Sequence, residues 1–79
     1  MALVISVAPF EDGWTVRSEA LETDLKFERG ARAEAAARAL ADRYAKAGRL
    51  AEVEIYLRDG ALAGRFVHTP RPPQPAYAG

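Results

Sequence analysis

One run of residues is unmistakably helical, and it limits how the remainder of the chain can fold. Residues 31–47, ARAEAAARALADRYAKA, have mostly high helix propensity, and Gly48 follows where a helix C-terminus favours positive φ. Gly30 is the predicted N-cap. Small and apolar side chains recur at the spacing of one helical face: Ala33, Ala36, Ala37, Leu40, Ala41, Tyr44 and Ala47. Because this face is mostly methyl groups, we predict that it packs on a β-sheet that supplies the large side chains.

Five segments around the helix have the composition and periodicity of β-strands. They are residues 3–8, 14–17, 21–28, 52–58 and 61–68. Pro9 is expected to end the first strand, and Gly64 predicts a bulge or a close helix contact in the last. Asp59-Gly60 predicts a type I′ hairpin turn, which needs positive φ at both positions. The order βββαββ predicts an α+β two-layer sandwich, with one mainly antiparallel sheet packed on a single helix.

Alternation within the strands separates a buried face from a charged one. The expected core comprises Ile5, Val7, Trp14, Val16, Leu25, Phe27, Val53, Ile55, Leu57, Leu62 and Phe66. The opposite face carries Arg17, Glu22, Asp24, Lys26, Glu52, Glu54, Arg58 and Arg65. A face of this kind favours contact with water, although an edge strand could still pair with a copy of itself.

The composition limits the classes of partner. The 79 residues hold 11 basic and 11 acidic side chains, so the formal net charge of zero disfavours nucleic acid and anionic membranes as partners. The absence of cysteine excludes thiol chemistry and fits a cytoplasmic protein. No apolar run is long enough for a membrane span, and the N-terminus lacks the basic region of a signal peptide. We expect one domain over residues 1–68 and a disordered, proline-rich tail over residues 69–79.

Several short motifs occur in an order that resembles a known family. They are Val4 to Pro9, Gly13-Trp14-Thr15-Val16, Phe27, Ala33-Glu34-Ala35, and Val53 to Asp59-Gly60. Together they span roughly residues 3 to 67 and resemble the small uncharacterised bacterial domain-of-unknown-function family 2188. The resemblance implies a bacterial source and the same α+β fold. It implies no activity, because the family has none that is established.

No residue pattern indicates catalysis. His68 is the only histidine, and we interpret it as a solvent-facing residue at a strand end. Four carboxylates could gather on the charged face if the third and fourth strands were neighbours: Glu22, Asp24, Glu52 and Glu54. Pairing with the interleaved arginines is the preferred interpretation. We therefore predict no enzyme, no catalytic, metal or cofactor-binding residue, no cofactor and no small-molecule ligand.

Two functions remain as expectations. The first is a small non-enzymatic binding or assembly module that acts through protein–protein contacts, with another protein or a second copy as partner. The alternative is a nucleic-acid-associated protein that contacts the backbone through Arg17, Arg58 and Arg65, with Tyr56 as a stacking platform. These four residues are the predicted surface contacts. Trp14 is predicted to be a core residue rather than an exposed binding hot spot, because it is in phase with Val16.

Overall fold

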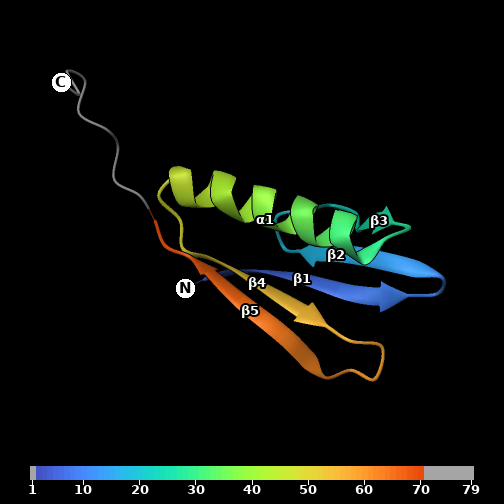
Figure 1. Cartoon of the computed structure of the whole chain (residues 1–79). Coiled ribbons are helices and arrows are strands. Elements are labelled where there is room, and N and C mark those ends of the chain that lie inside the picture. Colours follow the sequence, from blue (N-terminus) through green and yellow to red (C-terminus); the bar gives the residue numbers. More distant parts are fainter. Residues whose placement is uncertain (1, 71–79) are drawn as a thin grey trace, which may run out of the picture.

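The computed structural model describes residues 2–70, which form one helix on one face of a five-stranded sheet (Figure 1). The strands are β1 (Leu3–Phe10), β2 (Gly13–Ser18), β3 (Leu25–Phe27), β4 (Ala51–Tyr56) and β5 (Leu62–His68). The helix α1 (Gly30–Lys46) connects β3 to β4. This confirms the predicted α+β class, the two layers and the element order.

The sheet has the strand order β3-β2-β1-β4-β5, so β1 lies at its centre. Strands β1 and β4 are parallel, and the other three neighbouring pairs are antiparallel. The parallel pair follows from the crossover through α1, since parallel neighbours need a long connection. As a result β3 and β5 occupy opposite edges of the sheet.

Alanines bring α1 close to the sheet. Ala33, Ala37, Ala41 and Ala45 have no exposed surface, and they recur every four residues along the helix. The bulk beneath them comes from Ile5, Val7, Val16 and Val53, which are almost fully buried. The helix therefore packs as predicted. The predicted N-cap is wrong, because Arg29 occupies that position and Gly30 is already helical. Gly48 has φ 91°, as expected for a residue that ends a helix.

A single helix is too narrow to cover this sheet. A helix is about 10 Å across with its side chains, whereas five strands span roughly 19 Å between the outermost axes. Helix α1 packs mainly on β1, β2 and β4 and touches β5 least. Two predicted core residues on the helix side, Leu25 and Phe66, are consequently 39% and 37% exposed. Leu57 and Leu62 are exposed for a different reason. Strand β4 ends at Tyr56, so Leu57 lies in the loop, and a register shift pairs Leu62 with Tyr56 on the uncovered face. Those predictions from alternation alone are therefore wrong.

Two strand boundaries differ from the sequence-based expectation. Strand β1 continues through Pro9 to Phe10. Its pairing with β4 stops at Val7, and beyond that residue β2 alone, among the described strands, pairs with it. A proline is tolerated where one side of a strand is unpaired. Strand β3 contains only three residues, because a turn in which the Leu21 amide donates to the Ser18 carbonyl replaces the first half of the expected strand. Leu21 packs against the core from that turn.

The β4–β5 hairpin has a three-residue loop instead of the predicted type I′ turn. The Leu57 amide donates to the Ala61 carbonyl at 2.8 Å, and the Gly60 amide donates to the Leu57 carbonyl at 2.9 Å. Gly60 has φ 89°, whereas Asp59 does not have positive φ. This pattern fits a type I turn followed by one left-handed residue. The register also shifts by one residue between Ile55 and Tyr56, which confirms the predicted bulge beside Gly64.

No helix in the described part of the chain is long and apolar enough to cross a membrane. Residues 71–79, which hold most of the predicted proline-rich tail, lie outside the described residues.

Candidate functional site

The uncovered face of the sheet carries a row of polar residues that crosses four strands. Strand pairing aligns Arg17 of β2 with Ser6 of β1, Ser6 with Glu54 of β4, and Glu54 with Arg65 of β5. The Arg17 Nε atom lies 2.7 Å from Asp24 Oδ2 at one end of the row. Positive and negative side chains thus alternate across the face, which favours a solvated surface with internal ion pairing.

The β4–β5 part of this face is a small network. The Arg65 guanidinium lies 3.2 Å from a Glu52 carboxylate oxygen and 3.5 Å from one of Glu54. The Tyr56 hydroxyl donates to the other Glu54 oxygen at 2.8 Å. This hydrogen bond to Glu54 is the main cause that raises the pKa of Tyr56 above its ordinary value. The carboxylates are therefore engaged by groups of the same chain.

The four carboxylates considered as a cation site do not gather. Glu52 and Glu54 belong to β4, whereas Asp24 directly precedes β3, and β1 and β2 lie between those strands. Adjacent strands are about 4.8 Å apart, so the two groups are separated by roughly 14 Å. Among residues 2–70 no group of three or more His, Asp or Glu side chains could hold a metal ion.

The structure divides the four predicted contact residues. Arg17, Tyr56 and Arg65 lie on the uncovered face, and each contacts a carboxylate. Arg58 instead lies in the β4–β5 loop, where its Nη1 atom donates to the Glu11 carbonyl at 3.0 Å. Its guanidinium carbon is 5.7 Å from the centroid of the Trp14 ring. The expectation that Arg58 belongs to the charged sheet face is therefore wrong.

Trp14 closes the end of the core, where α1 begins. A Cβ atom added to Gly30 would lie 3.0 Å from the Trp14 ring, so glycine allows the helix to start directly against the indole. Trp14 is partly buried and packs against the core, opposite Phe27 in β3. Its predicted position in the core is confirmed, with one side open to Arg58.

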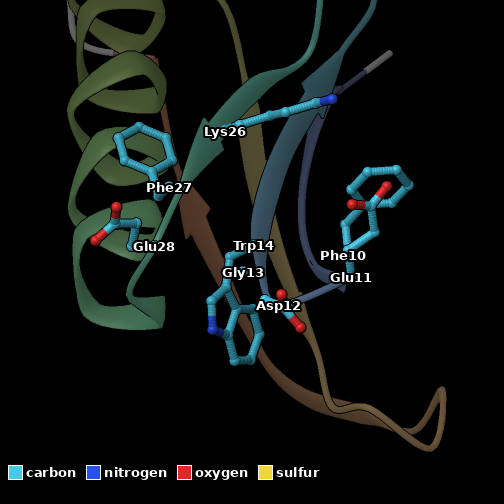
Figure 2. Close-up of a pocket in the computed structure, with 8 residues that line it drawn as sticks. All are labelled: Phe10, Glu11, Asp12, Gly13, Trp14, Lys26, Phe27 and Glu28. Atoms are coloured by element: carbon cyan, nitrogen blue, oxygen red, sulfur yellow. The ribbon is translucent and has the colours of Figure 1, made fainter.

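A shallow hollow of about 290 Å³ lies at this end of the sheet, around the β1–β2 turn. Its lining includes Trp14 and Phe27 on the helix side, and Phe10 and Lys26 on the other (Figure 2). The Lys26 ammonium lies 5.0 Å from the centre of the Phe10 ring. Because the lining side chains do not converge on one point, the hollow lacks the arrangement of polar groups that fixes a small ligand.

Strand β5 is the other candidate, and it carries exposed apolar side chains. No strand within residues 2–70 pairs with its outer edge, and Val67 on the uncovered face is 56% exposed. On the helix side, the Arg38 guanidinium stacks on the Phe66 ring at 3.8 Å from its centroid. His68 ends the strand and is partly exposed, as predicted.

Sequence reasoning did not identify the edge of β5 as the strongest candidate surface. A signal was present, because residues 61–68 contain neither lysine nor proline, the residues that often protect an edge strand. The missing information was the strand order, which places this segment at an edge. The Arg38–Phe66 contact had no sequence signal, because it joins residues 28 positions apart.

Comparison of the chain with models of known families, with curated proteins and with solved structures finds no significant match to any of them. The resemblance to family 2188 therefore stays a prediction.

Proposed function

We propose that this protein is a small binding or assembly module that acts through protein–protein contacts at strand β5, and that it is not an enzyme. The observation that carries the proposal is a strand edge that no other described strand pairs with, flanked by exposed apolar side chains on both faces of the sheet. Exposed main-chain donors and acceptors on such an edge accept a further strand, and the neighbouring side chains add apolar contact.

The charged residues support a protein partner over nucleic acid. Arg17 and Arg65 lie beside acidic groups of their own chain, and Arg58 donates to a backbone carbonyl. A phosphate would have to displace these contacts before an arginine could bind it. The formal net charge of zero also gives little long-range attraction for a polyanion. We place this module in the cytoplasm, because a chain without cysteine suits a reducing compartment.

The experiment that tests this function is site-specific photo-crosslinking in cells that express the chain. A photoreactive phenylalanine analogue replaces Val67 on β5 or, as a matched control, Val4 on β1. Both valines are exposed on the same face of the sheet and lie opposite Glu52, but only Val67 is at an edge. We expect protein adducts from position 67 well in excess of those from position 4.

The mass of the adduct identifies the kind of partner. Adducts with any protein that are specific to position 67 support the binding function. Equal labelling at both positions, or no adducts at position 67, would remove β5 as the contact surface.

A further inference from the structure

The last five residues of β5 lack the usual protection of an edge strand. Residues 64–68 contain no lysine, proline or bulge, and the register shift lies before them. The one charge in this stretch, Arg65, points back over β4, because Glu52 and Glu54 hold its guanidinium there. No charged side chain from residues 64–68 therefore extends beyond the free edge of β5.

This edge is self-complementary in one particular register. In an antiparallel pair formed by two copies, the two-fold axis is perpendicular to the joined sheet, and one residue lies opposite its own equivalent. If Arg65 is that residue, two like charges face each other, which destabilises the pair. If Phe66 is that residue, Arg65 lies opposite Val67 of the second copy, and no like charges meet.

We propose that β5 pairs with β5 of a second copy about a two-fold axis at Phe66. This inference rests on the proposed function and names the partner. Two sheets of five strands join into one sheet of ten. The two Phe66 rings meet on the helix side, each already stacked beneath its own Arg38. Aromatic cross-strand pairs of this kind stabilise antiparallel sheets.

The neighbouring pairs fit the same register. Gly64 lies opposite His68 of the second copy, so the smallest residue faces a large one. On the uncovered face the aliphatic stem of Arg65 lies against Val67 of the second copy, a residue that is 56% exposed in the single chain. A register centred on Val67 loses the aromatic pair, because Phe66 then faces His68.

The dimer is expected to be weak, because two short edges bury less area than a standard stable interface. We expect a dissociation constant between roughly 1 µM and 1 mM, which is the range of a weak association. Light scattering coupled to size exclusion should therefore show an average mass that rises from one chain to two across this range. A constant mass of one chain throughout would overturn the proposal.

Cysteine crosslinking tests the register, and the chain suits it because it contains no cysteine of its own. Arg65→Cys and Val67→Cys variants, one of them carrying a mass tag, are mixed in equal amounts and oxidised mildly. Directly opposite residues have Cα atoms about 4.5–5.5 Å apart, within the range of a disulfide. In the proposed register the mixed disulfide forms fastest. Faster formation of either like pair would exclude this register.

A pair of lysine substitutions tests whether the edge is responsible. Val67→Lys places the usual protective residue on the edge, opposite Arg65 of the second copy. Val4→Lys places the same residue on the same face, and also opposite Glu52, but at the centre of the sheet. We expect the dissociation constant to increase about tenfold or more for Val67→Lys and to change little for Val4→Lys. Circular dichroism confirms that both variants are folded.

If both lysine variants weaken the dimer equally, the contact is between sheet faces and the proposal is wrong. The result also separates this inference from the function on which it rests. A purified chain that stays monomeric, while position 67 still crosslinks to another protein in cells, would overturn the self-pairing alone. The absence of both would overturn the binding function as well.

Discussion

The two edges of the sheet are constructed differently. Strand β3 is three residues long, and charged residues surround it, with Asp24 before it and Lys26 within it. Strand β3 is also anchored to the core, because Phe27 packs against it. Strand β5 is seven residues long, contains no lysine, and receives little cover from α1.

The difference indicates which edge is available to a partner. A short edge with a lysine accepts another strand poorly, whereas a longer apolar edge accepts one readily. Helix α1 covers the sheet asymmetrically, so that the β3 side contributes to stability and the β5 side retains exposed apolar surface. We make four predictions, from the largest expected effect to the smallest: two compare matched positions on the two sides, and two test contacts on the β5 side.

Removal of an aromatic ring should cost more on the β3 side. We expect Trp14→Ala to lower the free energy of unfolding by about 3 kcal/mol, because it leaves a cavity beside Gly30. Phe66→Ala should lower it by only about 1–2 kcal/mol, because that ring is partly in water already. Urea denaturation followed by circular dichroism, at concentrations too low for dimers, measures both. Equal losses would contradict the asymmetry.

Glycine substitutions compare how tightly the two edges pack. A Cβ atom at Gly13 would lie 2.4 Å from the Phe27 carbonyl oxygen, so Gly13→Ala should force β3 away from β2. We expect a loss of roughly 1–3 kcal/mol. At Gly64 the nearest atom is 3.5 Å away on the Phe66 ring, which is an ordinary contact. Gly64→Ala should therefore change stability by less than about 1 kcal/mol. Thermal unfolding measures both changes. A loss of stability at Gly64 as large as that at Gly13 would show that β5 packs as tightly as β3.

The Arg38–Phe66 stack should contribute a small coupling between α1 and β5. A double-mutant cycle with Arg38→Ala and Phe66→Leu is expected to give a coupling energy of about 0.5–1 kcal/mol. Glu34 lies 3.1 Å from Arg38 and serves as the control, because Glu34→Gln removes the ion pair and leaves the ring contact. If the two substitutions lowered the free energy of unfolding additively, the coupling energy would be zero and the stack would not contribute to stability.

The smallest effect concerns the titration of Tyr56, beside the β5 edge. Its pKa is raised above 10.0, chiefly because its hydroxyl donates to Glu54. The fold favours the neutral phenol, so this contribution to stability is complete below the ordinary pKa and is lost as the pH rises through the folded-state pKa. The phenolate absorbance of the wild type, minus that of Tyr56→Phe, isolates this group. Glu54→Gln should lower the midpoint more than Glu52→Gln does. If both variants lowered the midpoint equally, the raised pKa of Tyr56 would come from nearby negative charge in general rather than from its hydrogen bond to Glu54.

Much of the fold was predictable from local pattern. The composition of residues 31–47 and the position of Gly48 located α1 to within one residue at each end. Alternation located the other strands approximately, but it failed over residues 21–24, where the turn at Ser18 takes Leu21 into the core. It also assigned Leu57 and Leu62 to the core, because strict alternation allows neither for a strand that ends at Tyr56 nor for the register shift that pairs Leu62 with Tyr56 on the uncovered face.

The sequence by itself determined the helix, the number and order of strands, the alanine face and the neutral balance of charge, because each depends on residues close together in the chain. Only the tertiary structure decided which strands became edges, how far α1 reached across the sheet, and which carboxylates met which arginines. Those features depend on contacts between distant segments, for which a local pattern carries no information. The candidate interaction surface is of this second kind, because the unprotected stretch at β5 became an edge only when β1 paired with β4.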